Sequence, residues 1–224
     1  MKRLLVIHLI VLSISGFISA QNINQFDANG KHHGIWKKNF DDTDVLRYEG
    51  AFQHGKEVGV FKFYKNIKGR AVLTATKQFN ADNDIAEVQF LASNGKVISE
   101  GQMKGRLRVG IWKYYQKNNN NLLTTENYNA HGVLDGERLV YYSSGQVSEK
   151  ELYEEGKLEG ITTVYSEANV IIKEITYSND MLHGSFKVYS ADGKLEIDGQ
   201  FQNDKKVGLW RYYEKGELIE QKKF

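Results

Sequence analysis

The sequence predicts an all-β fold, an elongated, twisted antiparallel meander of about eight β-hairpin repeats. A glycine recurs every 24 to 26 residues, aromatic residues recur at fixed distances after it, and turn-forming dipeptides separate segments of strand length. Asp84 holds the expected place between the second and third of these glycines. The recurring residues, called anchor glycines below, are Gly34, Gly59, Gly110, Gly136, Gly160, Gly184 and Gly208.

Aromatic residues mark further fixed positions in each repeat. Two positions after the anchor lie all three tryptophans of the chain, Trp36, Trp112 and Trp210. Five positions after it, six of eight repeats carry tyrosine: Tyr64, Tyr115, Tyr141, Tyr165, Tyr189 and Tyr213. The repeats close on Phe52, Phe79, Met103, Tyr128, Tyr153, Tyr177, Phe201 and Phe224. Agreement at several independent positions predicts a repeat array.

Turn-forming dipeptides divide each repeat into two strands. Asn94-Gly95 and Asp192-Gly193 lie within repeats, whereas His54-Gly55 and Glu155-Gly156 lie between them. These dipeptides supply the positive φ that tight hairpins need, which matters in a chain without proline. The segments between turns have ordinary strand lengths, so each repeat is expected to be one hairpin and the array to hold about sixteen strands.

Alternation along the first strand of each repeat predicts two different faces. The second and fourth positions after the anchor are mostly apolar, whereas the first, third and fifth mix aliphatic residues, lysine and tyrosine. So many strands cannot stay flat, so we expect a curved ribbon with contacts between neighbouring repeats and no compact globular core.

The first twenty residues have the pattern of a secretory signal peptide. Lys2 and Arg3 precede an apolar run from Leu4 to Ile14, and small residues lead to a predicted cleavage site after Ala20. A membrane anchor is the alternative, although this run is short for a span. Residues 21–28 are then a lead-in and residues 29–224 the array. The approximate repeats are 29–53, 54–79, 80–103, 104–128, 129–153, 154–177, 178–201 and 202–224.

The charge balance argues against partners of strong charge. Removing Lys2 and Arg3 leaves 28 basic and 28 acidic residues, a formal charge of zero. We therefore expect no nucleic-acid binding and no electrostatic attachment to a membrane. The expected location is the periplasm or the outside of the cell. The chain has no cysteine, which excludes disulfides and thiolate chemistry.

The repeat pattern resembles the MORN repeat, in the shorter bacterial variant often labelled as the YwqK-type antitoxin family. Its motif is clearest at Gly156-Lys157-Leu158-Glu159-Gly160, Gly110-Ile111-Trp112-Lys113-Tyr114-Tyr115 and Gly208-Leu209-Trp210-Arg211-Tyr212-Tyr213. The resemblance covers about residues 29–224 and implies elongated hairpin sheets used for binding or assembly. Departures occur in the third repeat, with Asp84, Ala86 and Gln89, and at Arg138 and Thr162.

No group of residues predicts catalysis, a cofactor site or a metal site. The histidines are spread one or more repeats apart, which does not suit metal ligation. Carboxylates are plentiful, but none forms a pair that stands out from the repeats. The acidic run of Glu149, Glu151, Glu154 and Glu155 is expected to be an edge strand or a turn.

The strongest candidate for a partner-binding face is the tyrosine series Tyr115, Tyr141, Tyr165, Tyr189 and Tyr213. Packing between neighbouring hairpins would also explain it. The leading functional hypothesis is an exported, non-enzymatic scaffold that binds a protein. Alternatives are an antitoxin or immunity role, taken from the family label, and lipid or glycan binding by the curved sheet. Self-association through the exposed end hairpins is a further option.

Overall fold

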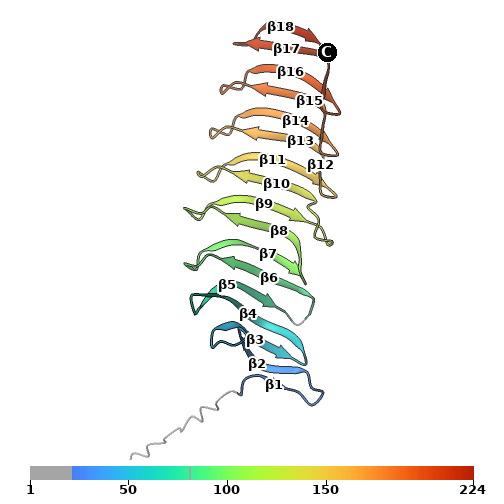
Figure 1. The fold of residues 1–224 in the computed structure, drawn as a ribbon. Helices are drawn as coiled ribbons and strands as arrows, with labels where there is room; N and C mark the ends of the chain where they lie inside the picture. The colour runs from blue at the N-terminus through green and yellow to red at the C-terminus, as the bar shows by residue number, and fades with distance from the viewer. Residues whose placement is uncertain (1–21, 81) are drawn as a thin grey trace, which may run out of the picture.

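The computed structural model describes residues 22–80 and 82–224, which form one open antiparallel sheet without helices (Figure 1). The predicted all-β meander of hairpin repeats is therefore confirmed. The strands of the described residues are β1 (Gln25–Phe26), β2 (His32–Asn39), β3 (Leu46–Gln53), β4 (Lys56–Ile67), β5 (Arg70–Phe79), β6 (Ile85–Leu91), β7 (Val97–Lys104), β8 (Leu107–Tyr115), β9 (Leu122–Tyr128), β10 (Gly136–Tyr141), β11 (Val147–Glu154), β12 (Lys157–Leu158), β13 (Gly160–Tyr165), β14 (Ile171–Ser178), β15 (Met181–Tyr189), β16 (Leu195–Gln202), β17 (Lys205–Glu214) and β18 (Glu217–Lys223).

The hairpins are stacked along one axis, from β1 at one end to β18 at the other (Figure 1). The tips of the hairpins line one side of the ribbon, and the connections between hairpins line the other. Some connections are two-residue turns in which both residues have positive φ, such as His54 with Gly55 and Asn203 with Asp204. This conformation matches the twist of the strands that it joins.

The anchor glycines lie where the first strand of a hairpin bends. Glu100 of β7 pairs with Lys113 of β8 and Gln102 pairs with Val109, so three residues of β8 lie opposite Gly101 alone. Gly110 is one of these three, and its φ is 65°. All seven anchor glycines have φ between 65° and 106°. A side chain would be strained in this conformation, which explains why glycine recurs there.

The assignment of Asp84 as the third anchor was wrong. Anchors pair with the closing residue of their hairpin, as Gly110 does with Tyr128, and in the third hairpin Ala86 pairs with Met103. The strands β5 and β6 pair without a register shift, so no residue there needs positive φ and the glycine signal is lost. Val88, rather than Ala86, therefore occupies the position of the tryptophans.

Two faces of the sheet differ as the alternation predicts. We call one the aromatic face; it carries the second and fourth residues after each anchor and the closing residues. The polar face carries the first, third and fifth residues. On β8 the Trp112 side chain is 0% exposed, whereas the neighbouring Ile111 is 62% exposed.

Glycines on one hairpin leave room for rings of the next hairpin. An added Cβ would lie 2.4 Å from the Phe61 ring at Gly50, 2.7 Å from Trp112 at Gly101 and 2.3 Å from Trp210 at Gly199. These distances are too short for any side chain, so the rings lie directly on the backbone. The sequence places an acidic residue and then glycine at each of these sites, in Glu49-Gly50, Glu100-Gly101 and Asp198-Gly199, and the ring explains the glycine.

Two further contacts hold the rings in place. The Trp112 indole N–H donates to the Gln102 carbonyl at 2.9 Å, and that of Trp210 donates to Gln200 at 3.2 Å. Phe201 meets the Trp210 ring edge to face, with centroids 5.2 Å apart. Such aromatic pairs stabilise neighbouring hairpins, so the core is a single layer spread along the ribbon.

At the middle of the aromatic face, an ion pair replaces the ring-on-glycine contact. Glu126 stands where other repeats have glycine, and Arg138 stands where they have tryptophan. The Arg138 guanidinium lies 3.5 Å from Glu126 and 2.5 Å from Glu151. Glu149 and Glu151 belong to the interior strand β11, so the expectation of an edge strand was wrong for these two residues.

The lead-in covers the N-terminal edge of β2. Phe26 of β1 packs on Trp36 with ring centroids 5.2 Å apart, and the Gln25 carbonyl accepts the Trp36 indole N–H at 3.0 Å. The predicted signal peptide, residues 1–20, lies outside the described residues. In the described part of the chain, no helix has the length and apolarity needed to cross a membrane.

Candidate functional site

The predicted tyrosine series lies on the polar face, half-buried, with one residue in each of five hairpins: Tyr115, Tyr141, Tyr165, Tyr189 and Tyr213. Each follows directly after the register shift in its own hairpin. Hairpins are two strands apart, so successive tyrosines lie roughly 10 Å from each other in a line.

Several of these tyrosines bond to the preceding hairpin. The Tyr115 hydroxyl donates to Glu100 at 2.5 Å, and Tyr189 donates to Glu174 at 2.7 Å. Burial, and then the bonded carboxylate, raises the pKa of Tyr115 and of Tyr189 to about 12. The same hydrogen bond lowers the pKa of Glu100. These hydroxyls therefore serve contacts within the sheet.

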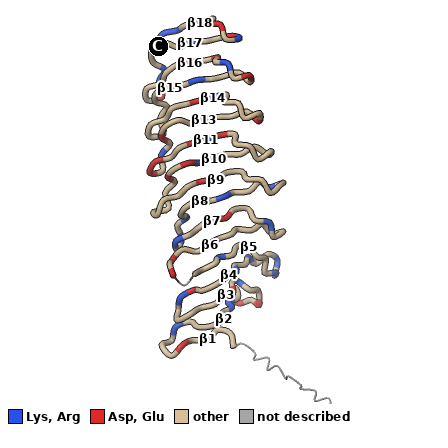
Figure 2. Tube along the Cα trace, turned by 180° about the vertical axis from the view of Figure 1, so that it is seen from behind, with Lys and Arg blue, Asp and Glu red and all other residues tan. Residues whose placement is uncertain are grey.

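A row of mostly polar and charged side chains crosses the middle of the polar face, one from each long strand. Glu49 lies between Lys37 and Lys62, at 3.4 and 3.5 Å. Acidic and basic residues are interspersed along the whole ribbon in Figure 2. We call this row the charged row; its members are Lys37, Glu49, Lys62, Thr76, Gln89, Glu100, Lys113, Thr125, Leu139, Lys150, Thr163, Glu174, Lys187, Asp198, Arg211 and Gln221.

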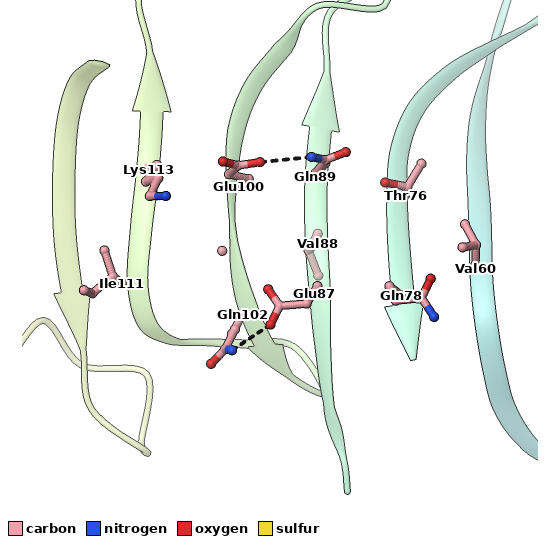
Figure 3. Close-up of a pocket in the computed structure, with 11 residues that line it drawn as sticks. Val60, Thr76, Gln78, Glu87, Val88, Gln89, Glu100, Gln102, Ile111 and Lys113 are labelled. Atoms are coloured by element: carbon pink, nitrogen blue, oxygen red, sulfur yellow. Dashed lines mark hydrogen bonds between the residues drawn. The ribbon is translucent and has the colours of Figure 1, made fainter. Parts of the chain in front are cut away.

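The polar face is hollowed around two neutral members of the charged row. Thr76 and Gln89 are neutral, and a groove of about 780 Å³ opens around them. Its lining comes from five consecutive strands, β4 to β8 (Figure 3). The lining residues are Val60, Thr76, Gln78, Glu87, Val88, Gln89, Glu100, Gly101, Gln102, Ile111 and Lys113.

The side chains of the groove form two rows across the strands (Figure 3). The first holds Thr76, Gln89, Glu100 and Lys113 of the charged row. The second, called the outer row, holds Val60, Gln78, Glu87, Gln102 and Ile111. The Gln89 amide donates to Glu100 at 2.9 Å, and the Gln102 amide donates to Glu87 at 2.7 Å. The two bonds fix both carboxamides in place between strands.

Aliphatic side chains stand at the two ends of the outer row. Val60 on β4 is 49% exposed, and Ile111 on β8 is 62% exposed. The groove therefore offers hydrogen-bonding groups along its centre and exposed apolar contacts at both ends. Such a combination suits binding of a chain-like ligand better than it suits a reaction.

A smaller hollow of about 230 Å³ repeats the same framework four hairpins later. Its lining of Ser185, Asp198, Gly199, Gln200, Leu209 and Arg211 corresponds position by position to Glu87, Glu100, Gly101, Gln102, Ile111 and Lys113. Here the charged row continues through Glu174 and Lys187, and Arg211 bonds to Asp198 at 3.1 Å. Glu174 and Lys187 take the places of Thr76 and Gln89, and the hollow beside them is smaller than the groove.

The sequence prediction of a binding face named none of the groove residues. A partial signal was present, because Glu100-Gly101-Gln102 and Asp198-Gly199-Gln200 share one motif. The outer row could not be found in this way, because it combines residues of five strands.

Among residues 22–80 and 82–224, no three His, Asp or Glu side chains lie together so that they could hold a metal ion. The groups that line the groove are hydrogen-bond donors, hydrogen-bond acceptors and aliphatic side chains.

A comparison with protein-family models agrees with the hairpin architecture. The model of the MORN repeat variant matches residues 134–155 and 182–203. The first match spans the hairpin of β10 and β11, and the second spans that of β15 and β16. These two hairpins are therefore MORN-type repeats, and the other hairpins share their architecture. No curated protein matches it.

The match to MORN repeats sets a coarse expectation for function. These repeats are commonly protein- or lipid-binding motifs, and the all-β repeat is a non-catalytic type. The narrower YwqK-type label stays a prediction.

Proposed function

We propose that this repeat protein is an exported, non-enzymatic scaffold that binds a protein partner through the groove over β4 to β8. The observation that carries the proposal is the groove itself: fixed carboxamides and carboxylates flanked by the exposed Val60 and Ile111. A partner that covers the groove would bury this apolar surface, which is the main source of binding free energy.

The distribution of charge supports a protein partner over a lipid surface. Acidic and basic residues are interspersed along the charged row, and the chain without Lys2 and Arg3 is formally neutral. Attachment to anionic lipid draws on clustered basic residues. Export is part of the proposal and rests on the signal-like pattern of residues 1–20.

The test is affinity capture of the partner from a native envelope extract. We expect Ile111→Asp, which puts a charge on the end of the groove, to reduce the captured partner at least ten-fold. The matched control is Leu209→Asp, because Leu209 takes the same place in the smaller hollow and is 39% exposed. Equal capture by both variants and by the unchanged chain would remove the groove from the proposal.

A further inference from the structure

The groove has hydrogen-bonding capacity that the chain itself does not use. Both Glu100 oxygens are bonded, one to Gln89 and the other to Tyr115. Glu87 differs, because only its Oε1 accepts a hydrogen bond, from Gln102 at 2.7 Å. Gln89 and Gln102 each donate one side-chain N–H within the sheet. The second N–H and the side-chain carbonyl oxygen of each form no hydrogen bond with a described residue. These groups suit a ligand that offers donors and acceptors in alternation, as a peptide backbone does.

The Glu87 carboxylate has no cationic partner among the described residues. Within the described part of the chain, neither Glu87 nor Glu100 forms an ion pair, but both Glu100 oxygens accept hydrogen bonds whereas Oε2 of Glu87 accepts none. In the smaller hollow, the equivalent position is the neutral Ser185. The extra carboxylate is therefore specific to the groove and calls for a cation from outside.

The length of the groove sets the distance between the two apolar side chains of a ligand that contacts both ends. Val60 on β4 and Ile111 on β8 are four strand steps apart, which is roughly 19 Å. An extended polypeptide covers that distance in about six residues, at roughly 3.3 Å per residue. An even number of steps places both end side chains on the same side of the segment. Glu87 on β6 lies midway between Val60 and Ile111 (Figure 3). It would therefore face the side chains in the middle of the bound segment.

We propose that the groove takes an extended polypeptide segment with an aliphatic residue at each end, six positions apart, and a lysine or arginine between them that pairs with Glu87. This inference rests on the proposed function and names the chemistry of the partner. The exposed aliphatic residues at both ends favour a polypeptide with apolar side chains over a glycan, whose hydroxyl groups would find no partner there.

The test measures binding of a synthetic peptide to the full chain by fluorescence anisotropy. The probe is a labelled heptapeptide of sequence Ile-Ser-Lys-Ser-Lys-Ser-Ile, and its matched control has glutamate in place of both lysines. We expect the lysine peptide to bind, to bind more weakly as salt rises, and to exceed the glutamate peptide at least ten-fold in affinity. Equal affinity of the two peptides, or no binding of either, overturns the inference.

Variants locate the peptide. Glu87→Ser copies the residue of the smaller hollow and Glu87→Gln keeps the bond to Gln102, so each is expected to fold and to weaken the lysine peptide about ten-fold. Leu209→Asp leaves binding unchanged. Unaltered affinity in both Glu87 variants contradicts the proposal, as does binding of an N-acetylglucosamine hexamer in place of the peptide. If Ile111→Asp abolishes capture of the native partner while the peptide does not bind, the proposed function stands and this inference fails.

Discussion

At the scale of single residues, tyrosine hydroxyls tie three of the hairpins to the hairpin before them. Tyr64 donates to Glu49 at 2.8 Å, Tyr115 to Glu100 and Tyr189 to Glu174, always fifteen residues back in the chain. The hydrogen bond favours the ionised carboxylate and the neutral phenol. It lowers the pKa of Glu49 and Glu100 and contributes to raising those of the tyrosines to about 12.

Loss of one such bond should destabilise the protein in a pH-dependent way. We expect Tyr115→Phe to lower the free energy of unfolding by about 1–2 kcal/mol at pH 7, because a bond to a charged group is lost. A carboxylate with a lowered pKa stabilises the fold above its ordinary pKa, near 4.5, and loses this effect as the pH falls. A phenol with a raised pKa stabilises the fold below about pH 10 and loses this effect toward pH 12.

The difference between Tyr115→Phe and the unchanged chain is therefore largest between about pH 5 and pH 10. Urea unfolding at a series of pH values measures it. Tyr213→Phe is the matched control, because the Tyr213 hydroxyl donates no hydrogen bond to a described residue although it occupies the same place in its hairpin. A loss of equal size in both variants, or a loss that does not change with pH, would show that the bond contributes nothing.

At the scale of the hairpin, a ring and the residue beneath it form a complementary pair across two hairpins. Trp112 lies on Gly101 and Trp210 lies on Gly199, whereas Arg138 lies against Glu126. Both kinds of pair occupy the same position between two hairpins. In one, a ring packs on a glycine, and in the other an arginine forms an ion pair with a glutamate. Arg138 and Thr162, which looked like departures from the repeat, therefore have neighbours that differ as well: Glu126 and Glu151 stand where glycine would be.

Exchange of both members should convert one kind of pair into the other. Glu126→Gly alone removes one of the two ion-pair partners of Arg138, and Arg138→Trp alone forces an indole onto the Glu126 side chain. In the double variant, glycine at 126, tryptophan at 138 and Glu151 repeat the arrangement of Gly101, Trp112 and Glu126. We expect the double variant to be more stable than the sum of the single effects by about 1–3 kcal/mol.

A double-mutant cycle in urea measures this coupling. The control pairs Arg138→Trp with Glu167→Gly. Glu167 is exposed in the turn that joins β13 to β14, and it does not lie on a strand that pairs with β10. That pair should show no coupling. A coupling near zero for Glu126 and Arg138 would contradict the complementary pairing.

The hairpins could be predicted from the sequence because their causes are local. An anchor glycine is needed wherever a strand bends with positive φ, and Gly50, Gly101 and Gly199 are needed under a ring. The third hairpin was placed two residues too early because its entry has no bend, so no glycine marks Ala86. The groove could not be predicted, because it depends on the lateral alignment of Val60, Glu87 and Ile111 from three hairpins.

At the scale of the whole molecule, the array is close to one-dimensional, and each hairpin contacts its neighbours in sequence (Figure 1). Nearly identical frameworks therefore recur along it, and a binding site arises where one framework departs from the rest. The groove over β4 to β8 is such a departure, since Thr76, Gln89 and Glu87 stand where the hairpins around Gln200 have Glu174, Lys187 and Ser185.

The most direct measurement is photo-crosslinking along the exposed row that follows the anchors. Val60, Ile111, Ile161 and Leu209 are each 39% or more exposed and take the same place in their hairpins, so they serve as a ruler along the ribbon. Each is replaced in turn by p-benzoylphenylalanine in the full chain, and crosslinked partner is quantified in intact cells. The account predicts strong crosslinks at positions 60 and 111 and weak ones at 161 and 209. Equal yields at all four positions, or a maximum at 161 or 209, would contradict it.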